Sequence, residues 1–125
     1  MNAPERSECW RLGDDERKIE YAGDTKIPHA ASFTVMKEDH TLGNLVRMQL
    51  LEDKQVRFAG YTQPHPLEHR IVIKVQTTGD SPPVDALSAA VEDLTSEVDQ
   101  LRERFLEGIM RHKQTQEERD YGNPL

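Results

Sequence analysis

The sequence predicts an α+β domain, in which a mainly antiparallel sheet of about four strands and two helices follow one another in the order ββαββα. Three observations lead to this fold class. Short segments carry the apolar pattern of strands, one segment in the middle has apolar residues at helical spacing, and a long stretch near the carboxyl end repeats its apolar residues in heptads. With 125 residues the chain is about one domain long, so these elements are expected to share one core.

The first two strands precede the first helix. Residues 18–22 alternate through Ile19 and Tyr21, which is typical of a half-buried strand. Gly23 and Asp24 indicate a turn after it. The second strand alternates through its apolar residues Ala31, Phe33 and Val35.

The first helix is expected to start with Thr41 as its N-cap, next to the acidic residues 38–39, which suit the positive helix end. Its apolar residues are Leu42, Leu45, Val46 and Leu50 on one face, with Met48 and Leu51 extending it. They leave only Gly43, Asn44 and Arg47 as a polar side, whereas an ordinary surface helix buries a stripe of roughly 100°. The sequence therefore predicts burial on two sides, by the chain's own sheet and by another chain.

The third and fourth strands flank a loop with two prolines. The residues expected to share one face of the third strand are Val56, Phe58 and Gly60. Pro64 and Pro66 cannot donate ladder hydrogen bonds and keep the loop extended. The fourth strand, residues 71–75, is the most apolar of the four.

The last helix is expected to run from about Pro83 to His112, with Ser81 as its candidate cap. Its apolar heptad residues are Val84, Leu87, Val91, Leu94, Val98, Leu101 and Phe105, and the pattern falters at Gly108. Such a helix is about 45 Å long, whereas a compact chain of this size has a radius of gyration of ~14 Å. The helix is therefore expected to extend past its own sheet.

Burial of this heptad stripe would contribute on the order of 10 to 20 kcal/mol, comparable with the net stability of a whole domain, about 5 to 15 kcal/mol. A partner is expected to cover it. A self-contained coiled coil is disfavoured because Ser88, Ala90 and Thr95 beside the stripe are not charged pairs. The predicted partner interface consists of Leu42, Leu45, Val46, Leu50, Leu87, Val91, Leu94, Val98, Leu101 and Phe105.

Both ends of the chain are expected to lie outside the core. Residues 1–17 are polar and predict an arm, with Trp10 and Leu12 as its apolar contacts to a neighbour. Residues 114–125 are charged and end with glycine and proline, so they predict a flexible tail after a frayed helix end. The single dimerisation domain is then residues 1–113.

Composition argues against several classes of function. The chain has 23 acidic and 16 basic residues, a formal charge of −7, and no cluster of Lys and Arg, so direct binding to nucleic-acid backbones is not expected. The single cysteine, Cys9, excludes an internal disulfide and fits a reducing compartment. No apolar run approaches the length of a membrane-spanning helix, and a secretory signal pattern is absent.

Catalysis and metal binding are not expected either. The sequence contains no GxSxG, GxxxxGK[ST] or HExxH motif. His65 and His69 are four residues apart, but Pro64 and Pro66 oppose a helix there, and no further ligands complete a zinc site. Asp39 and His40 are explained more simply by helix capping than by acid and base chemistry. No cofactor is predicted.

Three short motifs are informative together: residues 40–44 (HTLGN), 58–61 (FAGY) and 64–69 (PHPLEH). In this order they resemble the smaller alpha-like subunits of eukaryotic RNA polymerase II. Residues 1–4, 24–28 and 75–78 and the long last helix follow in the family's order, so the resemblance covers almost the whole chain.

The resemblance implies a non-catalytic nuclear subunit with a dimerisation domain like that of the bacterial polymerase alpha subunit. Its implied partner is a larger alpha-like subunit, and the pair forms the platform on which the large catalytic subunits, including the second-largest, assemble. The bacterial motif has two consecutive arginines after HTLGN, whereas Arg47 is followed here by Met48, so a contact of the second arginine is not transferred.

Two alternatives stay open at this stage. One is the paralogous small subunit shared by RNA polymerases I and III, although residues 58–61 and the amino-terminal residues favour polymerase II. The other is a homodimeric adaptor unrelated to transcription, in which the same helices would pair with a second copy. The roles of Gly43 and Arg47, as interface residues or as ordinary helix residues, are equally open.

Overall fold

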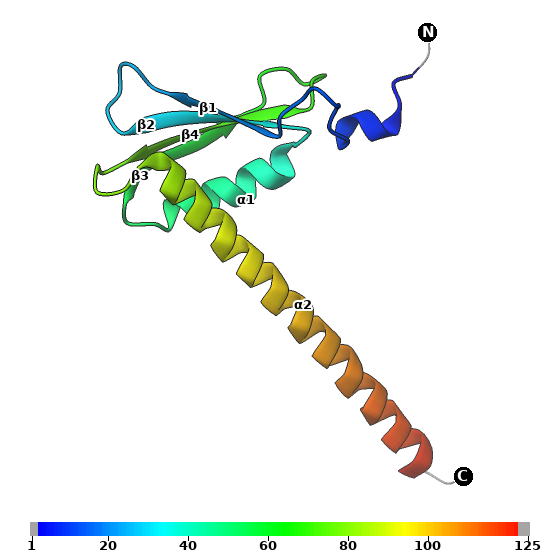
Figure 1. Cartoon of the computed structure of the whole chain (residues 1–125). Coiled ribbons are helices and arrows are strands. Elements are labelled where there is room, and N and C mark those ends of the chain that lie inside the picture. Colours follow the sequence, from blue (N-terminus) through cyan, green and yellow to red (C-terminus); the bar gives the residue numbers. More distant parts are fainter. Residues whose placement is uncertain (1–2, 123–125) are drawn as a thin grey trace. The chain divides into compact units, whose positions relative to one another are not determined.

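A computed structural model describes residues 3–122 of the chain (Figure 1). A short 3₁₀ helix in the amino-terminal arm precedes four strands and two α-helices, and the order ββαββα is as predicted. The elements are η1 (Arg6–Cys9), β1 (Ile19–Gly23), β2 (Ala30–Met36), α1 (His40–Leu51), β3 (Val56–Thr62), β4 (Arg70–Thr77) and α2 (Pro83–Gly122).

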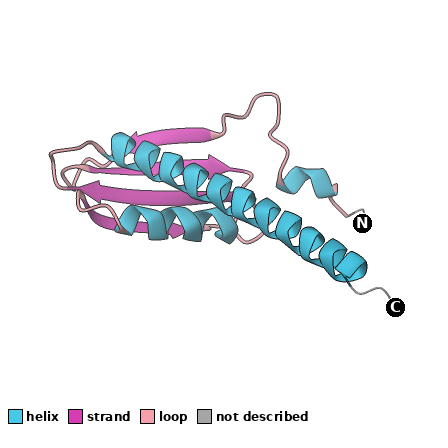
Figure 2. Ribbon diagram, turned by 90° about the horizontal axis from the view of Figure 1, so that it is seen from below, coloured by secondary structure: helices cyan, strands magenta, loops and turns pink. Residues whose placement is uncertain are grey.

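The four strands form one antiparallel sheet in the order β1-β2-β4-β3. Phe33 of β2 pairs with Ile73 of β4, and on its other side with Tyr21 of β1. Helix α1 and the first turns of α2, residues 83–91, lie on the same face of this sheet, with α1 along β3 and β4 (Figure 2). A single layer of helices therefore faces a single layer of strands.

The core lies between the sheet and these helices. Every second residue of β2 and β4 is buried, as their alternating sequences predict. Thr77 at the end of β4 is a buried polar side chain, and its hydroxyl donates a hydrogen bond to the carbonyl of Ser81 just before α2. The buried apolar residues are Ala31, Phe33, Val35, Val46, Leu50, Ala59, Ile71, Ile73, Val75, Ala86, Leu87 and Ala90.

The prediction that β1 is half-buried is wrong. Ile19 and Tyr21 point to the helix side of the sheet, since they pair with Val35 and Phe33, yet they are 52% and 60% exposed. The reason is tertiary: β1 is an edge strand, and α1 packs at the other edge, on β3 and β4. The ring of Tyr21 rests against that of Phe33, with the two centroids 5.5 Å apart.

Phe58 and Gly60 share one face of β3 as predicted, but the prediction is wrong for Val56, because the strand is irregular. Val56 pairs with Thr77, but the next pair is Phe58 with Gln76, so Arg57 is an extra residue in a β-bulge. The bulge shifts the alternation by one position. Ala59 is then buried, whereas Phe58 lies on the opposite face and is exposed.

Both predicted helix caps are corrected by the structure. The N-cap of α1 is Asp39, whose carboxylate accepts a hydrogen bond of 2.9 Å from the backbone amide of Thr41. Thr41 is therefore already inside the helix. At α2 the first helical residue is Pro83, and the carbonyl of Pro82 accepts from the amides of Asp85 and Ala86, so Ser81 lies one position too early to be the cap.

Helix α2 is longer than the sequence indicated. It continues to Gly122, so its predicted end near His112 is wrong, and the residues expected to fray are helical. The flexibility predicted for residues 114–125 stays a prediction, and residues 123–125 lie outside the described part of the chain. The chain divides into two compact units between Val91 and Glu92, so α2 begins in the first unit and continues through the second.

Candidate functional site: the exposed faces of the two helices

The start of α1 is held against β3 by a small cluster. The Tyr61 hydroxyl lies 2.8 Å from Nδ1 of His40, and the two rings meet edge to face. A Cβ atom on Gly43 would lie only 2.5 Å from the Tyr61 ring, so the tyrosine needs a glycine beneath it. Gly43 thus permits a close approach of α1 to the side chain of Tyr61 on β3, and not of one helix to another. Through this contact residues 40–44 meet residues 58–61 in space.

The side of α1 that lies against the sheet differs from the side that the sequence indicated. The helix buries Gly43, Val46 and Leu50 against the sheet. Leu45, Met48 and Leu51 are each about half exposed, at 49%, 57% and 50%. The side of α1 that faces away from the sheet is therefore apolar, although the sequence placed Leu45 with the buried residues and Gly43 on the polar side.

Two predicted interface residues of α1 have no surface left for a partner. Val46 and Leu50 are 2% and 0% exposed, because they form the contact between α1 and the sheet. Leu42 is half-buried and Leu45 is exposed. The candidate surface of α1, called here the α1 outer face, is accordingly Leu42, Leu45, Met48 and Leu51.

The first two turns of α2 pack within the first unit through small residues. Ala86, Leu87 and Ala90 are buried, so Leu87 supports the core and is not available as an interface residue. Val91, in contrast, is 48% exposed. Ala86 and Ala90, which are small enough to let a helix approach a sheet closely, lie outside the heptad pattern and were not predicted as contact residues.

After Glu92 the predicted heptad residues of α2 lie at the surface. Val98, Leu101 and Phe105 are 59%, 69% and 67% exposed, and Leu94 is half-buried. Leu106, Ile109 and Met110 add further exposed apolar area, which the heptad pattern alone did not include. The name α2 seam is used below for Leu94, Val98, Leu101 and Phe105.

The polar groups beside these faces are in ordinary structural roles. Arg47 donates a hydrogen bond of 2.7 Å to the side chain of Asn44 on the same helix, and its role in a subunit contact stays a prediction. The amide and the side chain of Thr41 both donate to Asp39, which holds the pKa of that carboxyl below its usual range. The charge is thus stabilised by helix capping.

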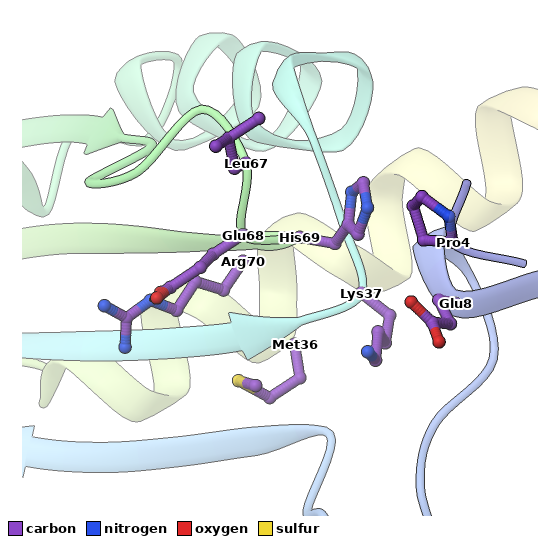
Figure 3. A pocket seen from close by; sticks show the side chains of 8 residues that line it. All are labelled: Pro4, Glu8, Met36, Lys37, Leu67, Glu68, His69 and Arg70. Atoms are coloured by element: carbon purple, nitrogen blue, oxygen red, sulfur yellow. The ribbon is translucent and has the colours of Figure 1, made fainter. Parts of the chain in front are cut away.

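A cavity of about 330 Å³ lies where the amino-terminal arm meets the loop before β4 (Figure 3). In Figure 3, His69 lies beside Lys37, and the amide of Lys37 donates a hydrogen bond of 2.6 Å to the carbonyl of His69. This bond ties the loop to the end of β2. The residues that line the cavity are Pro4, Glu8, Met36, Lys37, Leu67, Glu68, His69 and Arg70.

Within residues 3–122, no group of three or more His, Cys, Asp and Glu side chains is placed to hold a metal ion. None of the helices in this part of the chain combines the length and the apolar character that crossing a bilayer requires. Cys9 lies exposed in the amino-terminal arm. The features that stand out are therefore the apolar α1 outer face and the α2 seam.

A family model described as the RNA polymerase Rpb3/Rpb11 dimerisation domain matches residues 30–104 of the chain. The match begins at the first residue of β2 and ends inside α2. It includes three of the four seam residues, Leu94, Val98 and Leu101, which are part of the second unit.

Curated relatives match over nearly the whole chain. A Caenorhabditis elegans protein named probable DNA-directed RNA polymerase II subunit RPB11 is 49% identical over 122 residues, which cover 97% of this chain and 99% of the relative. A Dictyostelium discoideum protein named DNA-directed RNA polymerase II subunit rpb11 is 44% identical over 90% of this chain and 94% of its own. The identity is thus high along almost the full length of both.

The fold is similar to that in the crystal structure of DNA-directed RNA polymerase subunit L from Thermoplasma acidophilum. The TM-score is 0.63, with 22% sequence identity, over 78% of this chain and 96% of that one. The likeness supports the fold, and the predicted α+β class with a four-stranded sheet and a long last helix is confirmed.

Proposed function

The chain belongs to the RNA polymerase Rpb3/Rpb11 dimerisation-domain family, and we propose that it is the non-catalytic assembly subunit of RNA polymerase II that pairs with the larger alpha-like subunit. The pair forms the platform on which the large catalytic subunits, the second-largest among them, assemble. The observation that carries this proposal is the amount of large apolar side chain on the α1 outer face and the α2 seam that the chain leaves exposed.

The exposed faces match what a permanent heterodimer requires. Obligate interfaces are rich in apolar and aromatic residues and depleted of charge at their centre. Phe105 and Leu101 are suited to that centre, since each is about two-thirds exposed in the single chain. Their spacing along α2 suits packing against another helix.

The extent of the family match supports the same surface. A domain defined by its own core alone would not need the exposed turns after Glu92, yet the family's shared sequence pattern continues to residue 104. Dimerisation gives these turns a reason to share a pattern across the family. The proposed contact residues on α2 are Val91 and the α2 seam, and on α1 the outer face.

Polymerase II is favoured over the alternative of polymerases I and III, because relatives with 42–51% identity are named as polymerase II subunits. A polymerase II subunit acts in the nucleus, and we therefore place this chain there. The family description as a dimerisation domain accounts for the exposed helices without any catalytic group.

The test is co-expression of the chain with the larger alpha-like subunit of the same polymerase, followed by affinity purification through a tag on either protein and a mass measurement by light scattering. A stable 1:1 complex is the expected product. A soluble homodimer of this chain that gains no mass when the larger subunit is added would favour the homodimeric adaptor and refute the proposal.

A further inference from the structure

The charges of α2 are ordered around the α2 seam. At ~100° per residue, Arg102 and Arg104 lie roughly 80° to either side of the line through Leu101 and Phe105. Glu103, between them in sequence, lies roughly 180° from that line on the back of the helix. The two positions that border the seam here are therefore both cationic, and the anionic residue is directed away from it.

Charged residues also border the seam before Arg102 and after Arg104. Arg111 follows Arg104 by seven residues and borders the seam on the same side, whereas Glu97 precedes Arg104 by seven residues and is acidic. The four charged residues that border the seam, Glu97, Arg102, Arg104 and Arg111, are all exposed. Seven residues are close to two helical turns, so Glu97, Arg104 and Arg111 stand in one row along the seam, and Arg102 lies on its other side.

The arginines that border the lower seam have acidic neighbours on α2, but these neighbours lie farther from the seam. Arg111 lies 3.8 Å from Glu107 one turn away, but both side chains are well exposed, at 77% and 65%, and exposed pairs of this kind contribute little. Asp99 precedes Arg102 by three residues and Glu107 follows Arg104 by three, and like Glu103 they lie towards the back of the helix, roughly 140° to 180° from the seam line. A local excess of positive charge thus borders the lower seam of a chain whose net charge is −7.

We propose that the segment covering the lower α2 seam is an acidic amphipathic helix of the partner, with its carboxylates facing Arg102, Arg104 and Arg111 and a basic residue facing Glu97. This proposal rests on the proposed function and adds the chemistry of the partner helix. Complementary charges at the rim select the partner and fix the alignment of the helices, whereas like charges in these positions oppose binding.

A second copy of this chain fits the row less well. Its own seam offers two acidic bordering residues, Asp93 and Glu97, against the three arginines Arg102, Arg104 and Arg111. In a homodimer one of the three cations would remain unmatched. A more acidic helix from a different chain satisfies all of them.

The test compares two variants of the full-length chain in binding to the full-length larger alpha-like subunit, each at about 50 mM and about 500 mM salt. The exchange variant, Glu103→Arg with Arg104→Glu, keeps composition and net charge but moves the negative charge to the seam border. The matched control, Glu103→Arg alone, changes only the back of the helix. Both replacements preserve helix propensity, which circular dichroism of the isolated variants checks.

The exchange variant is expected to raise the dissociation constant about tenfold at the lower salt concentration and by much less at the higher one, because salt screens exposed charges. The control is expected to stay within about twofold of the wild type. A loss of less than threefold for the exchange variant, or an equal loss for the control, would overturn the charge proposal while leaving the heterodimer intact.

Two further outcomes are distinguishable from that one. If the unmodified chain does not bind the larger subunit at all, the proposed function itself fails and the charge proposal fails with it. If the chain alone self-associates with a dissociation constant that the exchange variant raises, the seam is covered by a second copy, and the assignment to an acidic partner helix is wrong.

Discussion

The first two turns of α2 and the turns after Glu92 belong to one continuous helix but differ in how far their apolar residues are buried. In the first turns the buried residues are mostly small, Ala86 and Ala90, with Leu87 as the one large side chain among them. In the later turns the apolar residues are large, and Leu101 and Phe105 are about two-thirds exposed. Small residues let a helix lie close to its own sheet, whereas large exposed ones present area to another chain.

The difference shows that an apolar pattern alone does not say which surface it serves. Leu87 and Leu101 occupy equivalent heptad positions, yet one is 9% and the other 69% exposed. Changes in the first region should therefore affect the stability of the isolated chain, and changes in the second should affect pairing. Four experiments probe this separation, beginning with the largest expected effect.

Val98→Asp should abolish pairing with the larger alpha-like subunit and leave the isolated fold unchanged. A carboxylate at this seam position would be buried without a partner, which costs about 3 to 5 kcal/mol, or roughly 10²- to 10⁴-fold in the dissociation constant. Pull-down at defined concentrations measures the loss. Ser96→Asp on the back of the helix is the control, and wild-type binding by the Val98 variant would defeat the assignment of the seam.

Leu50→Ala and Leu101→Ala should separate folding from pairing with the same chemical change. Leu50 is fully buried, so its truncation should lower the free energy of unfolding by about 2 to 5 kcal/mol. Leu101 is mostly exposed in the single chain, and its truncation should change that free energy by no more than about 0.5 kcal/mol while weakening pairing. Urea denaturation and binding measurements on both variants give the comparison, and equal loss of stability would remove the distinction.

Gly43→Ala and Gly108→Ala should have opposite effects on stability. At Gly43 the new methyl group would overlap the Tyr61 ring, at a cost of about 1 to 3 kcal/mol that exceeds the gain of ~1 kcal/mol in helix propensity. At Gly108 nothing lies within 4 Å, so only the gain remains. Thermal unfolding followed by circular dichroism should show a lower midpoint for the first variant and a higher one for the second. A rise in both would mean that Tyr61 yields without cost.

Asp39 should produce the smallest effect, a loss of stability in acid. Its pKa is lowered in the folded chain, chiefly by the hydrogen bond from the Thr41 amide, so its contribution is present above the unfolded pKa of about 3.9 and is lost as the pH falls through the folded value. Asp39→Asn keeps a capping side chain without the titration. The melting temperature of this variant should depend less steeply on pH below about 4, and an unchanged pH dependence would mean that the cap carries no such stability.

Much of the fold could be predicted because local patterns agreed with tertiary structure. Ala31, Phe33 and Val35 alternate in sequence and are all buried, and the two prolines of residues 64–69 stand in the loop before β4 as expected. The prediction of the β3 face failed at the bulge, since the extra residue Arg57 has no signature in the apolar pattern. The prediction for β1 failed because burial there depends on which strands the helices cover.

The candidate surface was predicted in kind but not in every residue. The sequence indicated that α1 has too wide an apolar arc for one contact, and Leu45, Met48 and Leu51 are indeed exposed. It placed the buried side incorrectly, because the pairing of Gly43 with the Tyr61 ring involves residues 18 positions apart in sequence. Only the packing of α1 on β3 brings these two groups into contact.

The sequence by itself determined the order of the elements, the apolar heptads of α2 and the short motifs that resemble the polymerase family. Periodicity and short motifs are properties of neighbouring residues, so they can be read without the structure. The tertiary structure alone decided which apolar residues the chain buries for itself. That choice depends on strand order, on the bulge in β3 and on the position of Gly43 against Tyr61, and these are contacts between residues distant in sequence. An apolar side chain looks the same in sequence whether its own sheet or another protein covers it.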